Sequence, residues 1–280
     1  MATLDFYRSA GPLTDPGPFA PRLADLPRSV PELCRAVQGL MVQVYWAERY
    51  GTTVDEARAE ALGHRSVAWK LGRILELDPE PLPTPRPVDR RLVGNCRDFT
   101  LMLVTFLRHQ GIPARARCGF GTHFMPDHYE DHWVCERWDE ARGEWLLTDP
   151  QLDALQREAL GIDFDPVDVP RDRFIVAGKA WQLCRTGAAD PNSFGIQDMH
   201  GLWFVRGNLL RDVAALQNAE MLPWDSWGPM HGEEEIAAAD LNLPDRLAAL
   251  TAEAPVAAEE LAALYRSEPC LQVPSDQLCD

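Results

Sequence analysis

Cys96, His132 and Asp149 are the residues of this 280-residue chain whose types and order fit covalent chemistry. Cys96 opens an apolar run, His132 lies in a strand-like run, and Asp149 ends a second strand-like run. A thiol nucleophile, an imidazole base and a carboxylate that orients the imidazole are the parts of a thiolate acyl-transfer site. The order therefore predicts a site in which a thioester forms on the cysteine.

Cys96 is predicted to lie in the first turn of a helix over residues 96–109. Unpaired amide groups and the helix dipole at that position favour the ionised thiol. Gly94 allows a tight entry into the helix and leaves room for substrate, so Gly94 and Asn95 are candidate substrate contacts. His132 follows 36 residues later (132 − 96), which is enough for one helix and one strand to bring the chain back.

The elements that must position these residues form an α+β pattern. The run 96–109 is too apolar for a surface helix, so we expect it to be central and buried. Strands are predicted over 114–120, 132–138 and 144–148, with a turn joining the last two. Such a hairpin places His132 and Asp149 at the same edge of an antiparallel sheet.

The rest of the chain divides into three predicted parts. Residues 1–28 read as an N-terminal arm, 29–175 as a catalytic core with N-terminal helices, and 176–280 as a helical, tryptophan-rich extension packed on the core. Further helices are predicted over 29–50, 53–74, 177–185, 202–217, 233–239 and 245–265, with an extended proline-rich connector over 78–87 and a loop over 155–175.

The motifs Gly94-Asn95-Cys96, His132-Trp133 and Asp149-Pro150 together resemble the transglutaminase-like superfamily of papain-like cysteine enzymes, which includes bacterial transglutaminase-core proteins. The resemblance covers residues 93–151. It implies a Cys96–His132–Asp149 triad on a papain-like core, in which the central helix carrying the cysteine packs on a small antiparallel sheet, with additional helices at both ends. It also implies an amide- or peptide-bearing substrate whose acyl group passes to an amine or to water.

The group that would hold the oxyanion of the reaction is left open by the sequence. No Gln or Trp lies shortly before Cys96, so the backbone N–H of Cys96 and one unidentified side chain remain. Gln182 and His200 are candidate donors if the second half of the chain folds over Cys96, and Trp203 is a candidate substrate contact. The alternative function is a catalytically silent peptide- or protein-binding module on the same fold. The intact Cys, His and Asp favour an enzyme.

A metal site is a further alternative, because Cys118, His123, His128, His132 and Cys135 lie close together in the sequence. Their spacings lack the paired short Cys-x-x-Cys or His-x-x-x-His arrangement of structural zinc sites. We therefore predict neither a metal nor another cofactor.

Composition and charge limit the classes of molecule that this protein could bind. The formal charge of −16 and the pI near 4.8 argue against nucleic acid or an anionic membrane as partner. The N-terminus lacks a secretory signal pattern, so we expect a cytoplasmic protein whose seven cysteines are reduced. The oligomeric state, the acyl donor and the acceptor cannot be read from the sequence.

Overall fold

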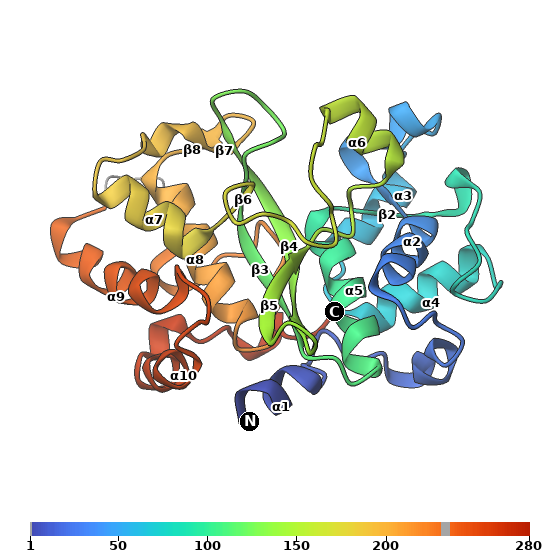
Figure 1. Cartoon of the computed structure of the whole chain (residues 1–280), viewed down its shortest axis with the longest axis horizontal. Coiled ribbons are helices and arrows are strands. Elements are labelled where there is room, and N and C mark those ends of the chain that lie inside the picture. Colours follow the sequence, from blue (N-terminus) through green and yellow to red (C-terminus); the bar gives the residue numbers. More distant parts are fainter. Residues whose placement is uncertain (1, 231–235) are drawn as a thin grey trace.

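A central sheet organises the fold in the computed structural model, which describes residues 2–230 and 236–280 (Figure 1). Within these residues the sheet has six strands in the order β6-β3-β4-β7-β8, and β5 pairs with β4 outside that path. The β4–β7 pair is parallel and the other pairs are antiparallel. The strands of this sheet are β3 (Ala114–Gly121), β4 (Tyr129–Asp139), β5 (Glu144–Thr148), β6 (Phe174–Val176), β7 (Phe194–Ile196) and β8 (Met199–His200).

Helices cover the sheet on two sides. Figure 1 shows α5 with α2 and α4 on one side of the sheet and α7, α8 and α9 on the other. The described helices are α1 (Ala2–Arg8), α2 (Val30–Leu40), α3 (Glu56–Ala59), α4 (Val67–Leu77), α5 (Cys96–His109), α6 (Ala154–Leu160), α7 (Ala177–Arg185), α8 (Leu202–Ala215), α9 (Asn242–Thr251) and α10 (Ala258–Ser267). None of them is long and apolar enough to cross a lipid bilayer.

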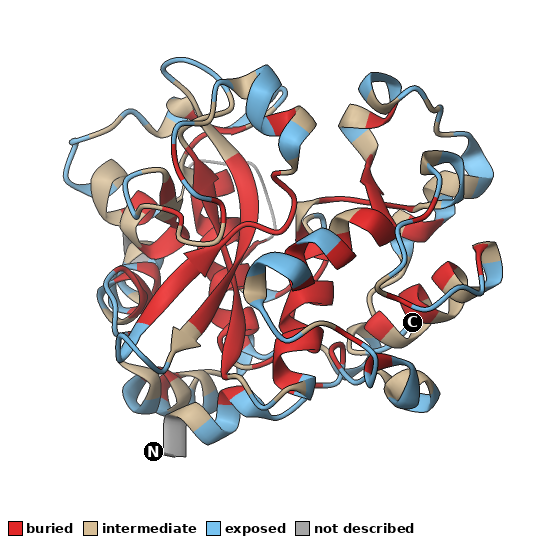
Figure 2. Ribbon diagram, turned by 45° about the vertical axis from the view of Figure 1, so that its right-hand side comes forward, coloured by how far each residue is buried: buried red, intermediate tan, exposed pale blue. Residues whose placement is uncertain are grey.

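Helix α5 is the central buried helix that the sequence predicted, with the predicted bounds. Every residue from Arg97 to Arg108 is buried, and Figure 2 shows α5 and the long strands almost entirely in the buried colour. Gly111, with φ of +76°, follows the helix and turns the chain into β3. The predicted α+β class, with the helix that carries the cysteine packed on a small sheet, is confirmed.

The predicted strands are also present, and β4 begins three residues earlier than expected. Antiparallel pairing sets Gly119 opposite His132 and Cys135 opposite Thr148. Because β5 ends at Thr148, Asp149 leaves the sheet next to β4. The hairpin therefore brings the histidine and the aspartate to neighbouring positions.

Two predicted helices in the first half have different limits. The helix expected over 29–50 ends at Leu40, and Met41–Gln43 forms strand β1, which pairs in parallel with β2 (Leu92–Gly94). A 3-10 helix over Val44–Tyr50 follows. The helix expected over 53–74 is divided into α3, a 3-10 helix and α4, because Ser66 caps a new helix by accepting a hydrogen bond from the Trp69 amide (3.2 Å).

The connector 78–87 is compact, and the prediction of an extended segment is wrong. Arg86 is buried within it, and its guanidinium donates hydrogen bonds to the surrounding backbone oxygens. Its hydrogen bonds go to the carbonyl groups of Asp78, Glu80, Pro81 and Thr84.

The second half of the chain joins the same hydrophobic core as the first, because buried residues of α5, the sheet, α8 and α9 form one cluster. The predicted loop over 155–175 contains most of α6, and the helices expected at 177–185 and 202–217 appear as α7 and α8. The helix expected at 233–239 begins outside the described residues, and a 3-10 helix spans Ala238–Leu241. The three-part division remains a prediction, and β6 crosses its boundary at residue 175.

Candidate active site

Cys96 is the first residue of α5, and a capping box fixes this end of the helix. The Asp98 amide donates to Asn95 Oδ1 (3.2 Å), while the Asn95 amide donates to Asp98 Oδ2 (3.1 Å). A side chain at Gly94 would be crowded, since a Cβ there would lie 2.5 Å from Met41 Cε and 3.1 Å from the Cβ of Asp98. The capping box and the close packing at Gly94 hold the thiol at the positive end of the helix dipole.

The structure brings His132 and Asp149 to the Cys96 thiol. His132 Nε2 lies 2.7 Å from Asp149 Oδ2, and both side chains are buried. The Cys96 thiol lies close enough to the imidazole for each group to shift the pKa of the other. The second oxygen of Asp149 accepts from the Gln151 amide (2.9 Å), which fixes the carboxylate in turn. The imidazole therefore lies between a thiol and an anchored carboxylate, the arrangement of a catalytic triad.

Burial and neighbouring charges shift the pKa values of Cys96 and His132 in opposite directions. Burial lowers the pKa of His132, but the charge and hydrogen bond of Asp149, together with Cys96, outweigh it and raise the pKa to about 10. Burial also raises the pKa of the Cys96 thiol, and the interaction with His132 only partly offsets this. The raised pKa of His132 favours transfer of the thiol proton to the imidazole, whereas the raised pKa of the thiol opposes it.

Cys96 and His132 open into a pocket of about 830 Å³. Its wall comes from both halves of the chain and is largely apolar, with charged groups at Glu130, Asp131 and Arg211. The aromatic residues of the wall are Tyr45, Trp46, Phe124, Trp203, Phe204 and Trp224. Tyr45 and Trp224 are exposed at 64% and 54%, which leaves apolar surface at the rim for a substrate to cover.

Of the three candidate site residues in the second half of the chain, one lines the pocket and two lie away from it. Trp203 lines the pocket, as a substrate-contacting residue must. The suggestion of Gln182 as oxyanion donor is wrong, because its amide nitrogen points to the Ala248 carbonyl (3.4 Å) where α7 meets α9. His200 is not the donor either, since it is exposed on β8 with its Nδ1 3.3 Å from Asn192 Oδ1.

Gln43 is a pocket residue that sequence reasoning missed. It is buried, lines the pocket beside Cys96, and its Oε1 accepts from the Tyr45 amide (2.7 Å). No described group accepts a hydrogen bond from its amide nitrogen, which therefore remains free to donate into the pocket. The β-branched and aromatic run Val42–Trp46 is the signal that favours a strand here over a helix.

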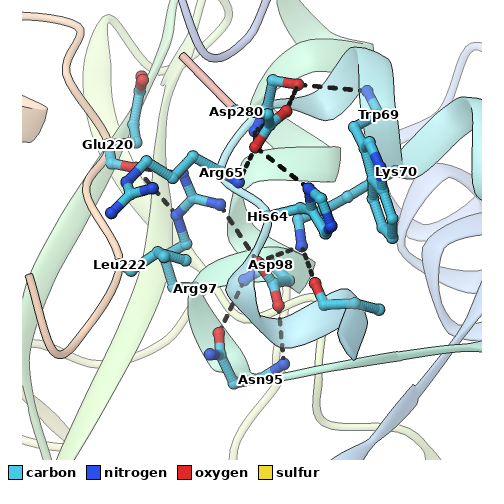
Figure 3. A network of polar contacts seen from close by, with 12 residues as sticks. His64, Arg65, Trp69, Lys70, Asn95, Arg97, Asp98, Glu220, Leu222 and Asp280 are labelled. Carbon is cyan, nitrogen blue, oxygen red and sulfur yellow. Dashed lines mark hydrogen bonds and ion pairs between the residues drawn. The ribbon is translucent and has the colours of Figure 1, made fainter. Parts of the chain in front are cut away.

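A buried charged cluster lies behind the first turn of α5 (Figure 3). Asp98 Oδ1 lies 3.2 Å from Arg97 Nη1 and 3.0 Å from Lys70 Nζ, and all three side chains are fully buried. Arg97 is the sequence neighbour of Asp98, whereas Lys70 comes from α4. The cluster fixes the carboxylate that caps Asn95 and so holds the position of Cys96.

The histidines and cysteines considered for zinc do not gather into one site. No group of three or more His, Cys, Asp or Glu side chains in the described part of the chain is arranged to hold a metal ion. His123 Nδ1 lies 3.2 Å from the Arg173 carbonyl, and burial lowers its pKa to about 4. His128 Nε2 lies 3.1 Å from Glu130 Oε2 at the pocket wall.

A comparison with protein families finds the similarity that the Cys96, His132 and Asp149 motifs indicated. Residues 64–150 match the family model of the transglutaminase-like superfamily. No curated protein matches the chain. A crystal structure of a proposed cysteine protease from Cytophaga hutchinsonii is similar at 14% identity and a TM-score of 0.35, over 61% of this chain and 44% of that one. The family match encloses Cys96, His132 and Asp149, so the part of the chain that is similar to the transglutaminase-like superfamily is residues 64–150.

Proposed function

We propose that this protein is a cysteine-dependent enzyme that transfers the acyl group of an amide or activated acyl substrate through a thioester on Cys96. One observation carries the proposal. His132 Nε2 lies 2.7 Å from Asp149 Oδ2, and the imidazole is near enough to the Cys96 thiol to lower the pKa of that thiol against the effect of burial. A binding module has no need to bury such a set at the wall of an 830 Å³ pocket.

In the first half-reaction His132 takes the proton of the Cys96 thiol, and the sulfur attacks the carbonyl carbon of the substrate. The carbonyl oxygen becomes an oxyanion, which the backbone N–H of Cys96 and the side-chain amide of Gln43 stabilise. The intermediate collapses when His132 returns the proton to the leaving amine. The amine departs and the acyl group remains on sulfur as a thioester.

In the second half-reaction an amine or water attacks the thioester while His132 accepts its proton. The carbon–sulfur bond breaks and the proton returns to the Cys96 sulfur. Asp149 holds the ring and stabilises the imidazolium in both steps. The apolar wall of the pocket limits the access of water, which favours transfer to an amine over hydrolysis.

Alkylation by iodoacetamide with mass mapping of each thiol tests the proposal. We expect Cys96 to react more slowly in His132→Ala, because the variant loses the group that lowers its thiol pKa. Cys270 and Cys279 are free and exposed, so they serve as internal references whose rates the variant leaves unchanged.

Burst release of p-nitrophenolate from p-nitrophenyl acetate, with the acetyl group recovered on Cys96, is the matching assay for the thioester. We expect it in the native protein and not in Cys96→Ala. A Cys96 that neither forms an acyl adduct nor depends on His132 would contradict the proposal and support the silent binding module.

A further inference from the structure

Arg211 is a charged residue of the pocket that the proposed chemistry does not use. It comes from α8 and is 9% exposed. Among the described residues that line the pocket it is the only arginine or lysine. A guanidinium stays charged under all ordinary conditions, so its position in the same pocket as Cys96 and His132 needs an explanation.

The hydrogen bonds of Arg211 go to neutral acceptors. Its Nε and Nη2 donate to the Asp225 carbonyl (3.2 and 3.0 Å), and Nη1 donates to Asn208 Oδ1 (3.1 Å). Five other buried arginines lie within 3.3 Å of a carboxylate oxygen, namely Arg97, Arg108, Arg115, Arg117 and Arg137. Arg86 is buried like Arg211 and also donates to carbonyl groups, but it does not line the pocket. Burial lowers the pKa of Arg211, in keeping with a charge that the described residues compensate incompletely.

The guanidinium has both hydrogen-bonding capacity and space for a ligand. Three of its bonds are accounted for, and a guanidinium has five N–H groups, so N–H groups remain on Nη1 and Nη2. Gly207 lines the pocket beside it, and a Cβ at that position would lie 3.0 Å from Nη1. The absence of a side chain there keeps the approach to the guanidinium open.

The surrounding charges indicate which anion fits. Asp131 and Glu130 line the same pocket, and Asn208 stands between Asp131 and Arg211, donating to Asp131 Oδ1 (2.7 Å). A multiply charged group such as a phosphate would be repelled by these two acids. A singly charged carboxylate matches the planar guanidinium and adds the least repulsion.

We propose that Arg211 binds a carboxylate of the substrate, so that the enzyme selects acyl donors that combine an apolar or aromatic body with one carboxylate. The aromatic side chains of Trp203 and Phe204, on the same helix, cover the apolar part. The inference rests on the proposed function of Cys96, since Arg211 acts by placing the carbonyl group near the sulfur.

Paired alkylating reagents test this inference. N-alkyl iodoacetamides that end in a carboxylate are compared with equally long reagents that end in a carboxamide, at several chain lengths. We expect the carboxylate reagent to label Cys96 about tenfold faster at the chain length that reaches Arg211, the effect of one charge-assisted hydrogen bond. The rate ratio falls close to one in Arg211→Gln and stays partly raised in Arg211→Lys.

Arg206→Gln is the matched control, because Arg206 is a buried arginine of the same helix that does not line the pocket. Its variant keeps the native rate ratio. A native ratio near one at every chain length, or a raised ratio that persists in Arg211→Gln, would overturn the inference. Labelling of Cys96 by the neutral reagents shows in the same experiment whether the proposed nucleophile itself is reactive.

A titration of the native protein tests for the carboxylate site without requiring a reactive thiol. The Arg211 Nε–H resonance, assigned by its loss in Arg211→Lys, is followed while phenylacetate or phenylacetamide is added. We expect a saturable shift with phenylacetate only. Equal responses to the two compounds, or none to phenylacetate, would exclude a carboxylate site at Arg211 whatever the outcome for Cys96.

Discussion

Gln43 is the Cα partner of Gly94 in the parallel pair of β1 and β2, although 51 positions (94 − 43) separate them in the sequence. This pairing places a side-chain amide beside the residue that lies two positions before Cys96. The Tyr45 backbone amide donates to Gln43 Oε1 (2.7 Å). This hydrogen bond fixes which end of the Gln43 side chain faces the pocket. The pair of β1 and β2 thus places a side-chain amide where we propose the oxyanion donor to lie.

Gln43→Ala is expected to slow acylation of Cys96 by p-nitrophenyl acetate by about 100- to 1,000-fold, the usual effect of losing one oxyanion donor. Alkylation by iodoacetamide should change little, because that reaction forms no oxyanion. Gln38→Ala is the matched control, since the Gln38 amide donates to the Pro150 carbonyl (3.1 Å) and does not line the pocket. Equal acylation rates for Gln43→Ala and the native protein would exclude Gln43 as the donor.

The sequence predicted the parts of the site that depend on regular elements. The apolar run after Cys96 gave the bounds of α5, and alternation with a turn gave the hairpin that joins His132 to Asp149. Gln43 was missed because β1 has three residues, too few for a period, and its partner strand lies far along the chain. Arg211 was missed because its place in the pocket wall depends on the packing of α8 against β3, β7 and β8.

Lys70→Met is expected to destabilise the protein by about 3 kcal/mol, because the change removes a partner of a fully buried carboxylate. Lys70 Nζ lies 3.0 Å from Asp98 Oδ1 and also donates to the Ala61 carbonyl (3.1 Å), as Figure 3 shows for the cluster. Urea unfolding at pH 7 measures the free energy. Cys96 should also lose part of its reactivity, since Asp98 holds the capping box.

The second lysine of the chain provides the control for this change. Lys179 lies 2.7 Å from Glu253 Oε1, but both side chains are largely exposed. Lys179→Met should therefore cost less than about 1 kcal/mol. Similar losses for the two variants would mean that the buried cluster has no special contribution to stability.

Asp149→Asn is expected to move the pKa of His132 down from about 10 toward the ordinary histidine value. Burial already lowers this pKa, and the carboxylate charge is the main factor that opposes burial. The imidazolium would then form less readily at pH 8, and acylation of Cys96 would slow. NMR titration of the His132 ring protons measures the shift, and an unchanged titration would show that Asp149 does not control the imidazole. Asp165→Asn, a change outside the pocket lining, should leave the titration unaltered.

Glu136→Gln is expected to destabilise the protein most near neutral pH. Glu136 is fully buried and lies within 2.9 Å of Arg115, Arg117 and Arg171. Burial raises its pKa, but the three guanidinium charges outweigh burial and hold the pKa well below its usual range. The stabilisation is therefore fully present above the unfolded pKa of about 4.3 and is lost as the pH falls below it.

Urea unfolding between pH 7 and pH 3 checks the sign of this effect. The difference between native protein and Glu136→Gln should be about 3 to 5 kcal/mol at pH 7, the cost of breaking a buried ion pair, and should shrink as the pH falls. Glu144→Gln is the control on the neighbouring strand, because the Glu144 ion pair with Arg142 is half exposed. A difference that stays constant from pH 7 to pH 3 would show that the charge of Glu136 is not what the three arginines stabilise.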